Sequence, residues 1–284
     1  MFWKIRDKEI SCHKTLLMGI VNITPDSFSD GGFAFHPQQA VARAFQLADE
    51  GADIVDLGAE STRPGALPVS EEEELKRLLP VLEELTQKKI SIPISIDTTK
   101  PAVAKACLLR GAHIINDVSG LKQSGCEMAE IAADFGAGLI VMHRRGNPET
   151  MQQFTDYGDL IRDISAELAS SLEMAARAGL GREHLAIDPG LGFSKTAEQN
   201  LEIMRRAEEF HALGFPVVLG PSRKSFIGKV TGREVSDRDW PTAAAIAWAV
   251  AKGIQILRVH EVALMRDVVR MSEAIRGENY VGTF

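Results

Sequence analysis

The stretch ISIDTTKPAVAKACLLRGAHIIN, at residues 94–116, has the pattern of a strand, a helix and a second strand. The apolar run at its start predicts a buried strand that ends at Asp97. Pro101 suits the first turn of a helix, where its missing N–H leaves no hydrogen bond unmade. Gly111 can adopt the left-handed conformation that ends a helix, and the next apolar run ends at Asn116. The stretch therefore predicts a βαβ unit in which each strand ends in a polar residue.

The same pattern occurs along the whole chain, as eight short apolar runs separated by helix-like stretches. No linker or change of composition divides the chain, so we predict one domain over residues 1–284, with the α/β fold of a (β/α)8 TIM barrel. In such a barrel the C-terminal strand ends meet on one face, where the active site forms. The polar residues that end or follow the runs are Asn22, Glu60, Thr62, Arg63, Asp97, Asn116, His143, Asp188, Ser222, Arg223, Lys224, Arg258 and His260.

Residues 1–16 precede the first core strand and alternate apolar with charged side chains. This alternation favours a short N-terminal β-hairpin that covers the bottom of the barrel, and a disordered tail is the alternative.

The loops that follow the strands are long, whereas the links from helix to strand are short. The long loops cover residues 22–36, 58–70 and 220–239 and are rich in Gly, Pro, Ser, Asp and Arg, a distribution typical of a functional face. The first of them, NITPDSFSDGG, has the single aromatic residue Phe28 and favours a mobile lid over a plain surface loop.

Composition excludes several classes of function. The net charge is −7 and no basic tract is present, which argues against a nucleic-acid partner. No apolar stretch reaches the roughly 18 residues that a membrane span needs, and the N-terminus lacks the apolar core of a signal peptide. Three widely spaced cysteines, Cys12, Cys107 and Cys126, predict buried free thiols. We therefore expect a soluble, cytoplasmic protein.

Asp97, Asn116 and Asp188 each close a short, mostly apolar run. A single buried acid of this kind is usually half of a salt bridge, but three polar groups at one barrel mouth indicate a ligand. A carboxylate accepts two parallel N–H bonds and an amide both donates and accepts, so the set suits a flat nitrogen heterocycle.

Arg63, Lys224, Arg258 and His260 predict an anion site, such as one for a diphosphate, on the same rim. A diphosphate also suggests Mg²⁺, for which the side-chain oxygen of Asn22 is a possible ligand. Asn22 could equally well cap its strand.

Other barrel chemistries fit less well. A metal hydrolase would carry HxH where this chain has NIT, and Lys224 follows its strand, which favours binding over Schiff-base chemistry. His143 is either a general base or a packed loop residue, and we favour packing.

Eight motifs in order resemble the dihydropteroate synthase family between about residues 17 and 262. They are MGIVNITPDSFSDGG, DLGAESTRPGA, SIDTTKP, HIINDVSG, VMHRRGNPETMQ, IDPGLGFSKT, LGPSRKSFIGK and ILRVHEV. Ala59 and Ser194 stand where the family often has Gly. Arg144 and Arg145 are bulkier and more basic than the family pattern, which leaves the role of their loop open.

The resemblance implies a homodimeric barrel enzyme that joins 4-aminobenzoate to (7,8-dihydropterin-6-yl)methyl diphosphate, with release of diphosphate. By position, Asp97, Asn116, Asp188 and Lys224 would hold the pterin, and Arg258 would flank the ring and face the diphosphate. Asn22 and His260 would complete the diphosphate and Mg²⁺ site. The residues around the aminobenzoate would be Phe28, Thr62, Arg63, Pro64, Phe193 and Ser225, and those closest to the chemistry would be Asn22, Asp97, Lys224 and Arg258.

Two alternatives remain. A pterin-binding methyltransferase that serves a corrinoid would share the strand-end acids, but would not need the SRKS, STRPGA and DSFSDGG motifs together. A catalytically silent paralogue would keep pterin binding alone.

Overall fold

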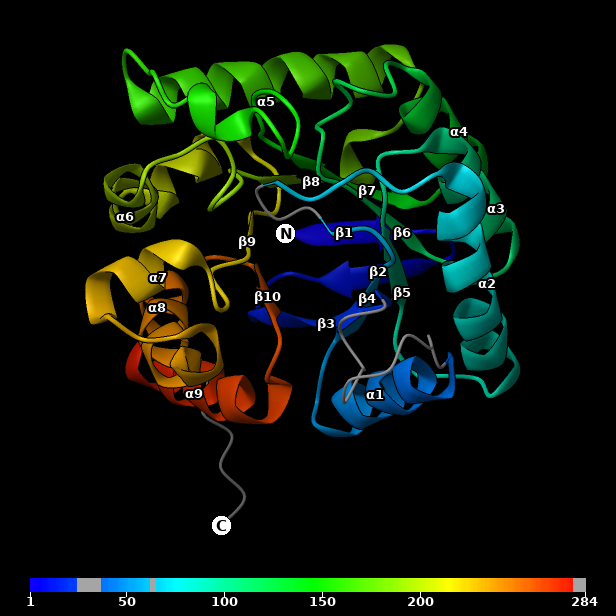
Figure 1. The fold of residues 1–284 in the computed structure, drawn as a ribbon, viewed down its shortest axis with the longest axis horizontal. Helices are drawn as coiled ribbons and strands as arrows, with labels where there is room; N and C mark the ends of the chain where they lie inside the picture. The colour runs from blue at the N-terminus through cyan, green and yellow to red at the C-terminus, as the bar shows by residue number, and fades with distance from the viewer. Residues whose placement is uncertain (25–36, 62–64, 278–284) are drawn as a thin grey trace.

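The computed structural model describes residues 1–24, 37–61 and 65–277. Eight parallel strands form one sheet in the order β8-β7-β6-β5-β4-β3-β10-β9. A bridge between Ile187 and Val217 joins the two edges of the sheet, so the strands close into the expected barrel (Figure 1). The strands are β3 (Leu16–Asn22), β4 (Ile54–Gly58), β5 (Ile94–Asp97), β6 (Ile114–Asp117), β7 (Gly138–Met142), β8 (Leu185–Asp188), β9 (Val218–Leu219) and β10 (Ile256–Val259).

Helices surround the barrel and return the chain from the end of each strand to the start of the next (Figure 1). Helix α2 begins where the Ser70 Oγ accepts a hydrogen bond from the Glu73 N–H at 3.2 Å. Pro37 and Pro101 are the first residues of α1 and α3, and Gly111, with φ of +100°, turns the chain toward β6. The α-helices are α1 (Pro37–Asp49), α2 (Glu71–Gln87), α3 (Pro101–Leu109), α4 (Glu127–Phe135), α5 (Leu160–Arg177), α6 (Ala197–Arg205), α7 (Ser225–Thr231), α8 (Asp239–Ala251) and α9 (Val262–Ile275). Short 3-10 helices lie at Met151–Gln153, Arg182–His184, Ala207–Leu213 and Val235–Asp237.

The N-terminal hairpin is present and covers the bottom of the barrel, as predicted. Strand β1 (Phe2–Ile5) pairs with β2 (Lys8–Ser11) in antiparallel fashion. The side chains of Trp3 and Ile5 are buried in one cluster with residues of the barrel strands, such as Met18 and Ile140. The Trp3 indole N–H also donates to the His184 carbonyl at 2.8 Å. Apolar packing and one long-range hydrogen bond therefore close the end of the barrel that lies opposite the strand C-termini.

The thiols follow the expectation only in part. Cys12 and Cys107 are free and buried, but Cys126 is free and exposed because it lies in the turn that begins α4. In the part of the chain that the structure describes, no helix is both long and apolar enough to cross a membrane.

Candidate active site

The C-terminal ends of the strands bring together five of the predicted polar side chains. Asn22, Asp97 and Asp188 are the last residues of β3, β5 and β8, and Asn116 and Arg258 lie one residue before the ends of β6 and β10. Because all these strands are parallel, the five residues lie at one mouth of the barrel.

Asp56, within β4, is the central acid that sequence reasoning missed. Its side chain is fully buried, and its Oδ2 accepts hydrogen bonds from Arg258 Nε at 2.6 Å and from Asn116 Nδ2 at 3.2 Å. Its Oδ1 is buried without a hydrogen-bond partner. The sequence does contain a clue, because Asp56 is the single charged residue in the apolar run IVDL. A charged side chain inside a barrel needs a hydrogen-bond or ion-pair partner.

Arg258 links two acids from neighbouring strands. Besides its bond to Asp56, it donates from Nη2 to Asp97 Oδ2 at 2.9 Å. Burial raises the pKa of Asp97 to about 7, against the lowering effect of Arg258 and Lys224 and with a further rise from Asp56 and Glu74. Asp97 is therefore harder to ionise than an exposed aspartate, and the neighbouring Arg258 favours its charged form.

Asp188 lies at the end of β8 and is also nearly buried. Its Oδ1 accepts a hydrogen bond from the Gly190 N–H at 2.7 Å. Burial raises the pKa of Asp188 to about 6, while that hydrogen bond and the charges of Lys224, Lys195 and Arg258 oppose the rise. A second acid at the mouth thus has three cations close enough to stabilise its ionised form.

Lys224 and Phe193 contact each other next to Asp188. The Lys224 ammonium lies 4.2 Å from the centroid of the Phe193 ring, a cation–π distance. Gly192 packs on the lysine stem, where a Cβ would stand 3.1 Å from Lys224 Cδ, so a larger residue would crowd the lysine.

The remaining residues that the sequence assigned to the site do not all lie in this cluster of strand-end side chains. His260 Nδ1 lies 2.9 Å from Ser222 Oγ, and Ser225 is the exposed first residue of α7. Phe28, Thr62, Arg63 and Pro64 lie outside the described residues, so their assignment to the aminobenzoate stays a prediction. Arg223, which the sequence predicted to lie at the barrel mouth, forms ion pairs with Asp239 and Glu261.

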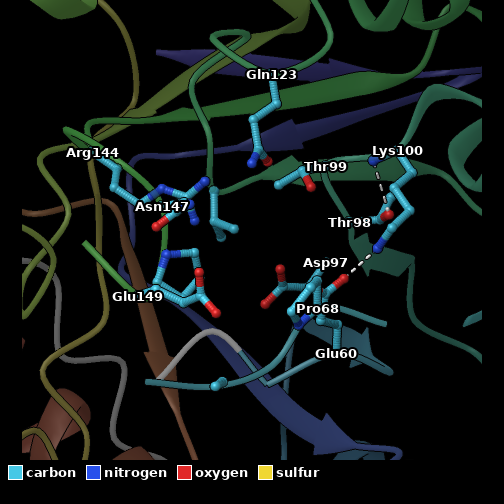
Figure 2. Close-up of a pocket in the computed structure, with 13 residues that line it drawn as sticks. Glu60, Pro68, Asp97, Thr98, Thr99, Lys100, Gln123, Arg144, Asn147 and Glu149 are labelled. Atoms are coloured by element: carbon cyan, nitrogen blue, oxygen red, sulfur yellow. Dashed lines mark hydrogen bonds and ion pairs between the residues drawn. The ribbon is translucent and has the colours of Figure 1, made fainter. Parts of the chain in front are cut away.

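A cavity of about 170 Å³ opens between the loops that follow β4, β5, β6 and β7 (Figure 2). Asp97 lines it, whereas Asn116, Asp188, Phe193, Lys224 and Arg258 do not. The residues that line it are Glu60, Ala66, Pro68, Asp97, Thr98, Thr99, Lys100, Val118, Gln123, Arg144, Asn147, Pro148 and Glu149.

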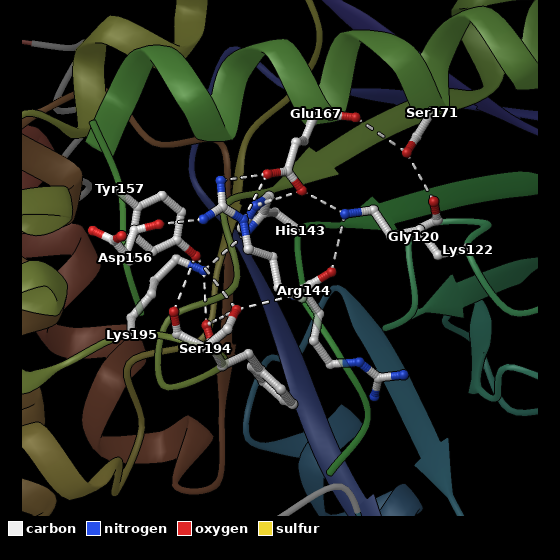
Figure 3. A network of polar contacts seen from close by, with 12 residues as sticks. Gly120, Lys122, His143, Arg144, Asp156, Tyr157, Glu167, Ser171, Ser194 and Lys195 are labelled. Carbon is white, nitrogen blue, oxygen red and sulfur yellow. Dashed lines mark hydrogen bonds and ion pairs between the residues drawn. The ribbon is translucent and has the colours of Figure 1, made fainter. Parts of the chain in front are cut away.

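His143 is a packed residue, as favoured from the sequence. It is buried, with Nδ1 3.0 Å from the Lys195 Nζ and Nε2 3.3 Å from a carboxylate oxygen of Glu167 (Figure 3). Burial, together with the Lys195 charge, lowers the pKa of His143 to about 4, which keeps the ring neutral. Its contacts are structural ones, to Lys195 in the loop that follows β8 and to Glu167 on α5.

Lys195 is a second residue that the sequence did not single out. It is buried, and besides its contact with His143 its ammonium donates to the Phe193 carbonyl at 2.9 Å. Two departures from the family pattern meet beside it, since the Arg145 N–H donates to Ser194 Oγ at 3.1 Å and the Arg145 guanidinium lies over the Tyr157 ring. These hydrogen bonds hold the backbone at Phe193 and Ser194. Figure 3 shows Lys195, Ser194 and Tyr157 within this network.

Replacing Lys195 with Met should lower the free energy of unfolding by about 1–3 kcal/mol, because the buried Phe193 carbonyl and His143 lose their partner. Burial lowers the pKa of Lys195 to about 7, from the 10.5 that is usual for a lysine. The unfolded chain then binds more protons between these values, so the wild type should gain stability as the pH rises above 7.

Urea unfolding of wild type and Lys195→Met between pH 7 and 9 measures both effects. The control is Lys105→Met, which removes an exposed lysine from α3. Equal pH slopes in wild type and Lys195→Met would contradict the assignment.

Comparison with known proteins agrees with this geometry. Residues 18–260 match the family model described as pterin binding enzyme, which is most of the chain. The chain belongs to this family.

Its relatives place it, within the family, among the dihydropteroate synthases. It is 45% identical over 263 residues to the dihydropteroate synthase of Synechocystis sp., covering 92% of this chain and 90% of that protein. The dihydropteroate synthase of Yersinia pestis, solved with a sulfonamide drug, superposes with a TM-score of 0.91 at 37% identity, covering 98% of this chain and 100% of that one. The Thermus thermophilus enzyme in complex with 4-aminobenzoate has a TM-score of 0.86 at 39% identity, covering 97% and 100%. As a family member the chain is a transferase of pterinylmethyl groups.

Proposed function

We propose that this chain condenses (7,8-dihydropterin-6-yl)methyl diphosphate with 4-aminobenzoate to give 7,8-dihydropteroate and diphosphate. The observation that carries the proposal is the pair of nearly buried acids, Asp97 and Asp188, with the amide of Asn116 on a strand between theirs. Carboxylates in a dry site accept the N–H donors of a pterin edge far more strongly than exposed ones do.

The reaction needs little covalent help from the protein. The bond from the pterin methylene carbon to the diphosphate oxygen breaks, and its electron pair leaves with the diphosphate. The arylamine nitrogen then bonds to the methylene carbon and loses a proton. We assign Arg63, Arg258 and His260 to the charge on the leaving group, and Asp97, Asn116, Asp188 and Lys224 to the pterin, whose electron-rich ring stabilises the cationic methylene.

No strong base and no covalent enzyme intermediate belong to this mechanism, since an aromatic amine is already a neutral nucleophile. The neutral, packed state of His143 is consistent with this. Trapping of a pterin–protein adduct during turnover would contradict it.

We also propose that Mg²⁺ assists, with Asn22 as its protein ligand. Among the described residues no three His, Cys, Asp or Glu side chains are placed to hold a metal ion together. Mg²⁺ commonly keeps waters and takes one or two protein oxygens beside a phosphate, so the half-buried Asn22 amide fits. When bound, the ion would neutralise charge on the diphosphate.

Removal of divalent cations with EDTA should stop product formation, and Mg²⁺ should restore it. In Asn22→Ala the Mg²⁺ concentration needed for half-maximal rate should rise about tenfold, in keeping with the loss of one ligand. If Asn22→Ala needs the same Mg²⁺ concentration as the wild type, Asn22 is not a metal ligand and only caps its strand.

We propose a cytoplasmic homodimer as the working form. Free thiols at Cys12 and Cys107 support a reducing compartment. Large apolar side chains are exposed on α8 and α9, at Trp240, Met271 and Ile275, and they support an interface there. Sedimentation of a monomer at micromolar concentration would exclude the dimer.

One assay tests the proposed function against its two alternatives. The full chain is given the pterin diphosphate with and without 4-aminobenzoate, and both diphosphate release and dihydropteroate formation are measured. The synthase gives both products when the arylamine is present. A silent pterin-binding paralogue or a methyltransferase gives no dihydropteroate.

A further inference from the structure

Arg223, in the loop that follows β9, has a backbone conformation that is unusual for an arginine. Its φ is +57°, in the left-handed region where a residue with a Cβ is strained and glycine is not. The Lys224 N–H donates to the Pro221 carbonyl at 3.1 Å, so Arg223 is the third residue of a tight turn. A turn with positive φ at its third residue favours glycine or asparagine there. With arginine at this position, other contacts must hold the turn.

Two carboxylates hold the Arg223 side chain. Its Nε and Nη2 donate to the two carboxylate oxygens of Asp239, at 2.7 and 2.8 Å, and Nη2 also donates to Glu261 at 2.8 Å. A bidentate pair of this kind fixes the direction of the guanidinium. Because Asp239 begins α8 and Glu261 directly precedes α9, the side chain is anchored to two helices.

The backbone of Arg223 has partners of its own. Its N–H donates to Thr242 Oγ1 at 3.2 Å, and its carbonyl accepts from Arg238 Nη1 at 3.2 Å. Both bonds use main-chain atoms of residue 223, so they are available to any non-proline residue at that position. The ion pairs with Asp239 and Glu261 are the contacts that only the arginine side chain supplies.

Both neighbours of Arg223 in the turn belong to the barrel mouth. Ser222 Oγ lies 2.9 Å from His260 Nδ1 and accepts a hydrogen bond from the His260 N–H at 3.2 Å. On the other side, the charge of Lys224 opposes the rise in the pKa of Asp188. A change of φ at Arg223 would rotate the peptide groups next to it and would redirect both neighbouring side chains.

Glu261 connects the same turn to His260 by a second route. Besides its bond to Arg223, it forms an ion pair with Arg43 of α1 at 3.6 Å. Arg43 Nη2 in turn donates to the His260 carbonyl at 2.6 Å. The turn and His260 are therefore held by one connected set of charges.

We propose that Arg223 is a positioning residue for the pterinylmethyl transfer, because its ion pairs hold a strained turn that directs Lys224 to the pterin and Ser222 to His260. Its guanidinium is engaged by Asp239 and Glu261, so it acts through its neighbours and not by contact with the substrate. The roles of Lys224 and His260 rest on the proposed function, whereas the held turn rests on the geometry alone.

Two substitutions of Arg223 separate strain from charge. Arg223→Met removes the ion pairs and keeps the cost of the left-handed conformation, whereas Arg223→Gly removes both. Binding of 6-hydroxymethylpterin to the full chain is measured by calorimetry. Arg223→Met should bind it about tenfold more weakly than the wild type, because Lys224 is no longer held in place, and Arg223→Gly should stay within about threefold of the wild type.

The matched control is Arg233, an exposed arginine of the same loop whose φ is not positive. Arg233→Met and Arg233→Gly should both bind the pterin as the wild type does. Equal losses of affinity in Arg223→Met and Arg223→Gly would show that the arginine acts by its own charge, and would refute the positioning role. Wild-type affinity in both would show that the ion pairs serve stability only, and would refute it as well.

A second variant tests the route through Asp239. Asp239→Ala should weaken pterin binding severalfold in the wild-type background and should have no further effect in Arg223→Gly, where no guanidinium is left to hold. Equal losses in the two backgrounds would overturn the proposal. If Arg223→Met does not fold, Arg223→Lys replaces it; it keeps the charge without the bidentate pair and should bind more weakly than Arg223→Gly.

Failure of the positioning role and failure of the proposed function are distinguishable. 6-Hydroxymethylpterin carries no diphosphate and cannot react, so its binding reports on the turn without turnover. A chain in which Arg223→Gly binds this pterin well and Arg223→Met does not, but which forms no dihydropteroate, would refute only the function. If both proposals hold, kcat/KM for the pterin diphosphate should fall in Arg223→Met by at least the same factor as the affinity and should be largely kept in Arg223→Gly.

Discussion

Asp188→Ala should weaken binding of the pterin substrate by roughly 2–5 kcal/mol, which is the usual cost of removing one partner from a buried, hydrogen-bonded charge pair. The Asp188 carboxylate is nearly buried, held by the Gly190 N–H, and influenced by three cations. Its loss removes the acceptor for two N–H donors of the ring and leaves those donors unpaired in a dry site. Calorimetric titration with a non-reacting pterin measures the change directly.

The pH dependence of the same titration identifies the group. Because burial raises the pKa of Asp188 to about 6, the free protein protonates this acid as the pH falls through that value. Pterin binding favours the ionised form of Asp188, so protonation of this acid should lower the affinity by up to tenfold per pH unit below about 6, in addition to any change from Asp97, whose pKa burial also raises. Asp188→Asn keeps the size of the side chain and should remove the Asp188 contribution to this slope. A fully active Asp188→Ala enzyme would refute the assignment.

Arg258→Met should lower the free energy of unfolding by about 3–5 kcal/mol, the cost of leaving a buried ionic partner uncompensated. The substitution strips Asp56 of its 2.6 Å hydrogen bond and Asp97 of its 2.9 Å hydrogen bond at once. Urea unfolding at pH 8 measures the loss, with Arg162→Met as the control for the removal of an exposed arginine.

The loss in Arg258→Met should be smaller at low pH. Without the arginine, the pKa of Asp97 rises further above its unfolded value, so the folded variant takes up a proton more readily as the pH falls. The double variant Asp56→Asn/Arg258→Met, which removes one of the stranded charges, should be more stable than Arg258→Met. An Arg258→Met protein within about 0.5 kcal/mol of the wild type would show that the bridge between the two acids contributes little.

Most of the fold could be predicted from short-range patterns. The apolar runs that become β3 to β10 and the proline and glycine positions at helix ends are local signals, and each matches the structure because it constrains the backbone of its own segment. The hairpin at residues 1–16 was predicted in the same way. That the acids at the strand ends lie close together was predicted from one further rule, which is that parallel strands in a barrel end on one face.

The partners of these acids could not be predicted in the same way. Arg258 and Asp56 are 202 residues apart in the chain, and only the register of β10, β3 and β4 brings them within hydrogen-bond distance. Local periodicity assigned Asp56 to an apolar strand. The periodicity contains no information about which distant cation forms an ion pair with Asp56.

The chain's own order of residues therefore determined the barrel, its hairpin and the face on which Asp97, Asn116 and Asp188 gather, because these depend on the conformation of each segment. Only the tertiary structure decided that Lys195 is buried against His143 and that Arg144 is left as a buried cation in a small cavity. Burial and pairing of charges depend on what the other segments bring alongside, and that is fixed when the whole barrel closes.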